Sequence, residues 1–141
     1  MAIPAHLRLE FVTPERAIVY DDVDEVELPG EDGYFGVLPG HAPLLAALRV
    51  GEMWYRKGAE KRYAFLAGGF AEVLAGRVAV LAYTAERAED IDAQRAEAAK
   101  HRAEERLGKT HLAEIDAERA RVALMRALIR LSVSRQGRPP A

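Results

Sequence analysis

Hydrophobic and polar residues alternate through the first 83 positions of the chain. Leu7, Leu9 and Phe11 alternate with Arg8 and Glu10, which is the period of a strand with one side in solvent. Further apolar segments are separated by turn residues, and they predict strands over 17–20, 23–28, 44–50, 52–56, 61–66, 70–74 and 78–83. Many short strands with regular turn signals predict an antiparallel β-sandwich or flattened barrel.

Positions 29–43 form the segment richest in turn residues. They contain four glycines and three prolines in fifteen residues. Glycine permits positive φ and proline fixes φ near −65°, so we expect a compact and stiff loop here.

The pattern changes after Tyr83, the last aromatic residue. Alanine and charged residues then dominate, and only Gly108 and Gly137 remain of the eleven glycines. This composition favours helices. We predict one helix from an N-cap at Asp90 to Leu107, with Gly108 as its C-terminal cap, and a second over about 110–134.

The two helices are predicted to pair as an antiparallel hairpin, because their connection is short. The expected apolar positions of the first are Ile91, Ala96, Ala99, Ala103 and Leu107. Those of the second are Leu112, Ile115, Val122 and Ile129, with Leu124, Leu128 and Leu131 beside them. A buried methyl group contributes about 0.8 kcal/mol, so we expect the alanines to hold the hairpin weakly enough for it to move.

The chain is therefore predicted to be an α+β protein. Its expected parts are a β-sandwich over 1–84, a helical hairpin over 85–136 and a tail over 137–141. The sequence contains no cysteine, which excludes disulfides and thiolate zinc sites. It also contains no run of about 20 apolar residues and no signal-peptide core at its start.

No catalytic or metal-binding pattern is recognisable. The segment 107–110 resembles the end of a phosphate-binding loop, but Ala103 stands where its first glycine is required. The four histidines include no pair at zinc-ligand spacing, and serine occurs only at 132 and 134. We expect a non-catalytic protein that requires no cofactor.

Charge is distributed unevenly along the chain. All 22 acidic residues lie at or before Glu118, and the residues after it carry a charge of +6 against −8 for the rest. Such a cationic segment is either a solvated helix face or a surface that meets an anionic partner.

The loop and the later strands resemble one known family. Residues 27–45, with the sequence ELPGEDGYFGVLPGHAPLL, resemble the loop of the epsilon subunit of rotary ATP synthases. Residues 66–73 and 78–81 resemble later strands of that family at the expected distances. The resemblance continues through the helical half and covers essentially the whole chain.

This resemblance implies a place in the central stalk of a bacterial, proton-translocating ATP synthase. The partners would be the gamma subunit, the ring of c subunits and acidic segments of the catalytic beta subunits. The location would be peripheral, on the cytoplasmic face of the inner membrane. The chain would couple rotation to ATP synthesis and inhibit ATP hydrolysis through a mobile helical arm.

The resemblance also suggests a docking loop that contacts the c ring or gamma. Its residues are Gly36, Val37, Leu38, Pro39, Gly40 and His41. The alternative is a turn whose glycines and prolines serve only backbone geometry, with His41 as a local hydrogen-bonding group.

A regulatory ATP site is the second implication of the resemblance. Its residues would be Ile91, Asp92, Arg95 and Ala96, with Arg126 and Arg130 from the second helix, and Glu86 and Arg102 as weaker candidates. Guanidinium groups bind phosphate in a bidentate manner, and a small alanine leaves room for a planar base. The alternative is an ordinary i, i+3 pair between Asp92 and Arg95.

A function of another class is the alternative to a stalk subunit. The arginine-rich second helix would suit a nucleic-acid-binding or scaffold module. Against this hypothesis, all ten aromatic residues, which base stacking would need, lie in the other half of the chain.

Overall fold

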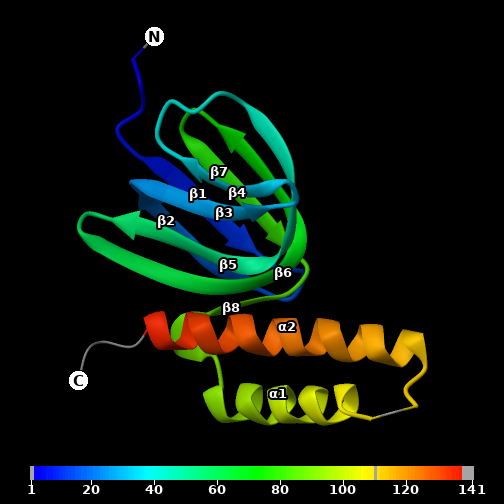
Figure 1. Cartoon of the computed structure of the whole chain (residues 1–141). Helices are drawn as coiled ribbons and strands as arrows, with labels where there is room; N and C mark the ends of the chain where they lie inside the picture. Colours follow the sequence, from blue (N-terminus) through cyan, green and yellow to red (C-terminus); the bar gives the residue numbers. More distant parts are fainter. Residues whose placement is uncertain (1, 110, 138–141) are drawn as a thin grey trace. The chain divides into compact units, whose positions relative to one another are not determined.

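In this computed structural model the chain divides into two structural units, and the boundary lies between Arg87 and Ala88. The structure describes residues 2–109 and 111–137. Strands form the first unit and helices the second (Figure 1), which confirms the predicted α+β class and the order of its parts. The first unit ends three residues beyond the expected position 84, and the expected tail lies outside the described residues apart from Gly137.

Eight strands form one hydrogen-bonded sheet in the order β2-β1-β7-β6-β5-β3-β4, with β8 also paired to β6. The pairs are antiparallel except β1 with β7, which is parallel. The strands are β1 (Leu7–Val12), β2 (Ala17–Val23), β3 (Glu25–Gly30), β4 (Gly33–Val37), β5 (Leu44–Lys57), β6 (Glu60–Leu74), β7 (Arg77–Ala82) and β8 (Ala85–Arg87).

The long strands β5 and β6 allow this one sheet to form both layers of a sandwich. The last part of β6, from Gly69, pairs with β7, whereas Ala64 to Leu66 pair with β8. The change of neighbour falls at Gly68 and Gly69, whose φ angles are +77° and +135°. The predicted break at these glycines is therefore wrong, because the strand bends there and continues.

Gly51 is a second glycine at which a break was predicted and none occurs. It lies inside β5 and pairs with Leu66. A Cβ at Gly51 would lie 2.7 Å from the Cβ of Pro29. Gly51 therefore allows β5 and β3 to approach each other closely, and β5 continues through it.

Two further strand assignments differ from the sequence-based expectation. The expected loop over 29–43 contains β4, which pairs with β3 around a turn at Glu31 and Asp32. Strand β8 was not predicted, because three residues are too few to show a period.

The core of the sandwich consists of the inward-facing residues of both layers. Along β1, Leu7, Leu9 and Phe11 are fully buried and alternate with partly exposed residues, as predicted. The two long strands contribute Met53 from β5 and Leu66 from β6 to this core, and both are fully buried.

The second unit consists of a short 3-10 helix η1 (Ala88–Asp90) and the helices α1 (Ala93–Leu107) and α2 (Glu114–Gln136). Asp92 caps α1, and its side chain accepts a hydrogen bond from the backbone N–H of Arg95. The predicted cap at Asp90 is wrong, because that residue ends η1. The predicted start of the second helix at 110 falls on a residue outside the described part of the chain, and α2 begins at Glu114.

Buried alanines lie along both helices. Ala96 and Ala103 on α1 and Ala120 and Ala127 on α2 are all buried, and each pair is spaced by seven residues. The burial of Ile91, Ala96 and Ala103 confirms much of the predicted pattern for the first helix. For the second helix, Leu131 is buried, but Ile115 and Leu128 are exposed, so burial of those two was wrongly predicted.

The bend in β6 makes a strong prediction for stability. A Cβ at Gly69 would overlap the backbone oxygen of Leu81, and the φ of +135° is itself strained for other residues. We expect Gly69→Ala to lower the free energy of unfolding by about 3 kcal/mol or more. Urea denaturation of the purified protein measures this change. Gly36→Ala is the matched control, because a Cβ there meets nothing within 4 Å, and equal losses in both variants would contradict the assigned role.

Candidate functional sites

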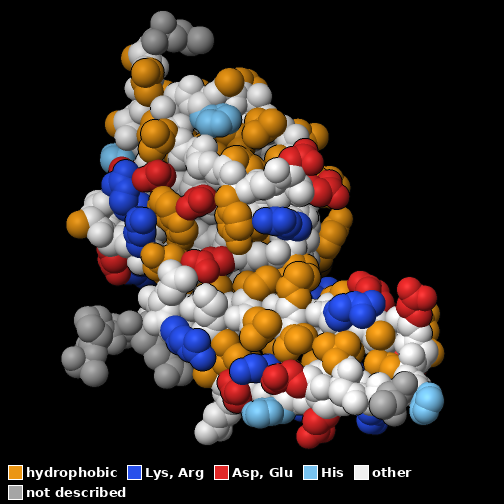
Figure 2. Space-filling view, viewed as in Figure 1, with side chains coloured by type: hydrophobic (Ala, Val, Ile, Leu, Met, Phe, Trp, Pro, Cys, Tyr) orange, Lys and Arg blue, Asp and Glu red, His pale blue; other side chains and the backbone are white. Residues whose placement is uncertain are grey.

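A groove of about 450 Å³ lies on the helical hairpin. Its lining residues are Ala99 from α1 and Glu118, Arg119, Val122, Ala123, Arg126 and Arg130 from α2. On the face drawn in Figure 2, hydrophobic side chains gather over both helices, with charged side chains around them. The groove therefore combines an apolar floor with cationic walls.

Charge in the groove is predominantly positive. Three arginines line it with one carboxylate, Glu118, which accepts hydrogen bonds of 2.9 and 3.2 Å from Arg121. Arg121 does not line the groove, so this carboxylate is partly neutralised from outside it. The arrangement suits a ligand that carries anionic groups and a flat apolar part.

The predicted nucleotide site is divided by the structure. Arg126 and Arg130 line the groove, whereas Ile91, Asp92, Arg95 and Ala96 lie at or just before the start of α1 and do not line it. Arg95 is exposed and stands one turn before Ala99, so it shares a face with a lining residue.

Two residues of the predicted site have evident structural roles. The N–H of Arg95 donates to Asp92 Oδ1 at 3.1 Å, which makes the pair a helix cap. Ala96 is 4% exposed, so a planar base could reach it only if the side chains that cover it moved. Of the weaker candidates, Glu86 lies in the other unit, on β8, and Arg102 is exposed on α1. Sequence reasoning missed Arg119, although it stands seven residues before Arg126 and so shares its face.

The predicted docking loop is partly strand. Gly36 and Val37 belong to β4, and Val37 is fully buried in the core. The side chain of Val37 therefore offers no surface for a partner. The exposed part is Leu38 to His41, in which the Leu38 side chain is 54% exposed.

Hydrogen bonds fix the conformation of this loop. The N–H of Gly40 donates to Ala75 O at 2.7 Å, and that of His41 donates to Leu38 O at 3.1 Å. His41 Nδ1 lies 2.6 Å from Ala42 O, so its ring also makes the local contact that the alternative interpretation described.

An apolar groove on the outer face of the sandwich was not predicted. It has a volume of about 320 Å³ and includes Leu45, Phe70 and Leu81, which are 72%, 47% and 57% exposed. Arg77, Glu10 and Glu72 also line this groove. Arg77 Nη2 lies 2.8 Å from Glu10 Oε2, and Arg77 Nη1 lies 4.0 Å from Glu72 Oε1. The available signal was a large apolar residue at outward-facing positions of β6 and β7, where solvent-facing strands normally carry polar ones.

Other kinds of site are absent from the described part of the chain. No group of three or more His, Asp or Glu side chains is placed to hold a metal ion among residues 2–109 and 111–137. Within the same residues, neither helix is long and apolar enough to cross a membrane.

Family models match both units of the chain. The model of the ATP synthase delta/epsilon chain β-sandwich domain matches residues 6–88, and that of the long α-helix domain of the same chain matches residues 89–135.

Curated relatives align along nearly the whole chain. The ATP synthase epsilon chain of Nitratidesulfovibrio vulgaris strain DP4 is 49% identical over 127 residues, covering 90% of this chain and 94% of the relative. That of Desulforamulus reducens is 46% identical and covers 90% and 96%. That of Solibacter usitatus is 48% identical over 132 residues and covers 94% and 98%.

Two solved structures share the fold. A chain in the mitochondrial ATP synthase of Euglena gracilis, solved as OSCP, F1 and c ring, matches with a TM-score of 0.70 at 22% identity, covering 96% of this chain and 81% of that one. A chain in the central stalk and c ring of the Tetrahymena thermophila enzyme matches with a TM-score of 0.62 at 12% identity, covering 91% and 96%.

The role of Asp92 as a helix cap can be tested without any ligand. We expect Asp92→Ala to destabilise α1 by about 1 kcal/mol, because the N–H of Arg95 loses its acceptor. Hydrogen exchange of the amides in the first turn of α1 measures the loss. Asp92→Asn keeps an acceptor and should leave exchange nearly unchanged, and equal protection in all three proteins would contradict the cap.

Proposed function

Because the chain belongs to the ATP synthase delta/epsilon chain family, we propose that it is a non-catalytic subunit of the central stalk. It couples rotation to ATP synthesis by joining the gamma subunit to the c ring. The observation that carries this proposal is the 49% identity to an ATP synthase epsilon chain across both units. This likeness favours a stalk subunit over the nucleic-acid-binding alternative.

The apolar groove on the sandwich is the proposed seat of gamma. Exposed Leu45, Phe70 and Leu81 form a side-chain surface of the kind that marks protein interfaces. The ion-paired Arg77 and Glu10 lie at its edge, where polar groups surround the apolar centre of typical interfaces.

The loop from Leu38 to His41 is the proposed contact with the c ring. Its conformation is already fixed by the hydrogen bonds of Gly40 and His41. A preformed loop loses little conformational entropy on docking, so more of the contact energy appears as affinity. Attachment to the ring would hold the chain peripherally at the cytoplasmic face of the membrane.

The helical hairpin is the proposed regulatory arm. When extended, it would inhibit ATP hydrolysis by bringing the arginines of α2 against acidic segments of the beta subunits. Four of the buried residues of α1 and α2 are alanines, which contribute little each. Such a pair can separate at modest cost in free energy.

ATP would act by stabilising the folded hairpin. The groove that contains Arg126 and Arg130 is lined mainly by α2, and α1 contributes Ala99, so separation of the helices would remove that part of its lining. A ligand shifts an equilibrium only by binding one state better than the other. ATP bound in the groove meets that condition.

The arm makes a direct prediction for hydrolysis. A chain that ends at Ala88 retains all eight strands and should still join the complex. ATP hydrolysis by complexes reconstituted with this shortened chain should exceed that of complexes with the full chain. Equal hydrolysis rates at equal occupancy would contradict the inhibitory role.

The groove makes a separate prediction for binding. Arg126→Ala and Arg130→Ala should each weaken ATP binding by the isolated protein about tenfold or more, because each removes a phosphate-binding guanidinium group. Isothermal titration calorimetry measures the affinity. Arg135→Ala is the matched control on the same helix, since Arg135 is exposed and does not line the groove, and undiminished affinity in the first two variants would refute the site.

A further inference from the structure

The segment from Ala2 to His6 runs along one end of the sandwich and contacts two turns there. Ile3 lies against Gly40, where an added Cβ would be 3.0 Å from Ile3 Cγ2. Pro4 lies against Gly76, where an added Cβ would be 3.3 Å from Pro4 Cγ. Both contacts depend on glycine, because a side chain at either position would push the segment away.

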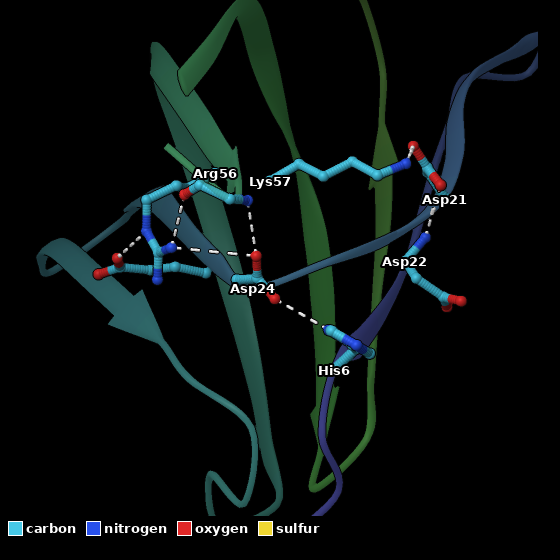
Figure 3. A network of polar contacts seen from close by, with 8 residues as sticks. His6, Asp21, Asp22, Asp24, Arg56 and Lys57 are labelled. Carbon is cyan, nitrogen blue, oxygen red and sulfur yellow. Dashed lines mark hydrogen bonds and ion pairs between the residues drawn. The ribbon is translucent and has the colours of Figure 1, made fainter. Parts of the chain in front are cut away.

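A hydrogen bond anchors the far end of this segment. His6 Nδ1 lies 2.9 Å from Asp24 Oδ1, at the corner between β2 and β3 (Figure 3). The other carboxylate oxygen accepts a 2.7 Å hydrogen bond from the N–H of Gly58 and lies 3.9 Å from Arg56 Nη1. The Gly58 bond, followed by His6, lowers the pKa of Asp24, so the anchor is a charged carboxylate near neutral pH.

The two turns beneath the segment are themselves joined. The N–H of Gly40 donates to Ala75 O at 2.7 Å, and the N–H of Arg8 donates to Gly76 O at 2.9 Å. The loop from Leu38 to His41 is thus bonded to the β6–β7 turn through Gly40, and Ile3 contacts it at the same residue. The segment therefore contacts both the loop itself, at Gly40, and the β6–β7 turn to which the loop is bonded, at Gly76.

We infer that Ala2 to His6 act as a strap that fixes the Leu38–His41 loop, with the His6–Asp24 pair as its fastening. His6 is a positioning residue: it acts on the loop through Ile3 and Pro4. That the fixed loop docks on the c ring rests on the proposed function, whereas the fixing of the loop does not.

Hydrogen exchange of the Gly40 amide, followed by NMR in the full-length protein, tests the strap. His6→Ala removes the fastening, and Ile3→Gly removes the side chain that contacts Gly40. Each should speed Gly40 exchange about two- to fivefold, the range expected for the loss of an exposed interaction. Amides in the centres of β1 and β7 serve as references and should not change, which separates an opened loop from a destabilised fold.

Two control variants sharpen the result. His6→Gln keeps a donor for Asp24 and should restore slow exchange. Lys57→Gln removes the 2.8 Å ion pair with Asp21, which involves no strap residue, and should leave Gly40 unaffected. Unchanged exchange in His6→Ala and Ile3→Gly, or equal acceleration by the Lys57 control, would overturn the inference.

Binding to purified c ring in detergent separates the strap from the proposed function. Weaker binding by His6→Ala and Ile3→Gly, restored in His6→Gln, supports both. Faster Gly40 exchange with unchanged ring affinity supports the strap and contradicts the docking role of the loop.

Discussion

The bend at Gly68 and Gly69 is the constraint on which the sandwich depends. At this point β6 stops pairing with β8 and starts pairing with β7, while β5 follows it throughout. Gly69 can take this path because it lacks a side chain where the Leu81 backbone passes. The bend places β7 and β8 in different layers, and it leaves Phe70, the next residue, on the outer face beside Leu81. One backbone feature therefore builds both the core and the apolar groove.

The hairpin depends on a different kind of packing. Buried alanines spaced by seven residues on both helices let the backbones approach, and near its end α2 also buries the larger Leu131 and Val133. Ile115 and Leu128 remain exposed, and Val122 helps to line the arginine-bearing groove. The same choice of small residues weakens the pair and creates the space in which a ligand could strengthen it.

The sequence predicted the features that repeat and missed those that depend on distant neighbours. The alternation around Leu9 and the change of composition after Tyr83 identified the sandwich and the helices. The continuity of β5 through Gly51 was not predictable, because it depends on the distant Pro29. The cap of α1 is Asp92 and not the predicted Asp90, because Asp90 belongs to η1. The sequence could not distinguish the two, since both aspartates are equally good N-cap residues. Arg126 and Arg130 were placed on one face by spacing alone, but whether Ala96 is open or covered depends on the partner helix.

The candidate surfaces differ in what they require before a partner can bind. The loop from Leu38 to His41 is held by backbone hydrogen bonds and by Ile3, so its conformation is set in advance. The groove on the hairpin is walled by arginines, and fixing each such side chain costs about 0.5–1.5 kcal/mol. Its lining also comes from both helices, so the cost of pairing weakly packed helices adds to the cost of binding. A stalk must stay attached through every turn, whereas a sensor must respond to concentration. The rigid loop suits the first requirement and the adjustable groove suits the second.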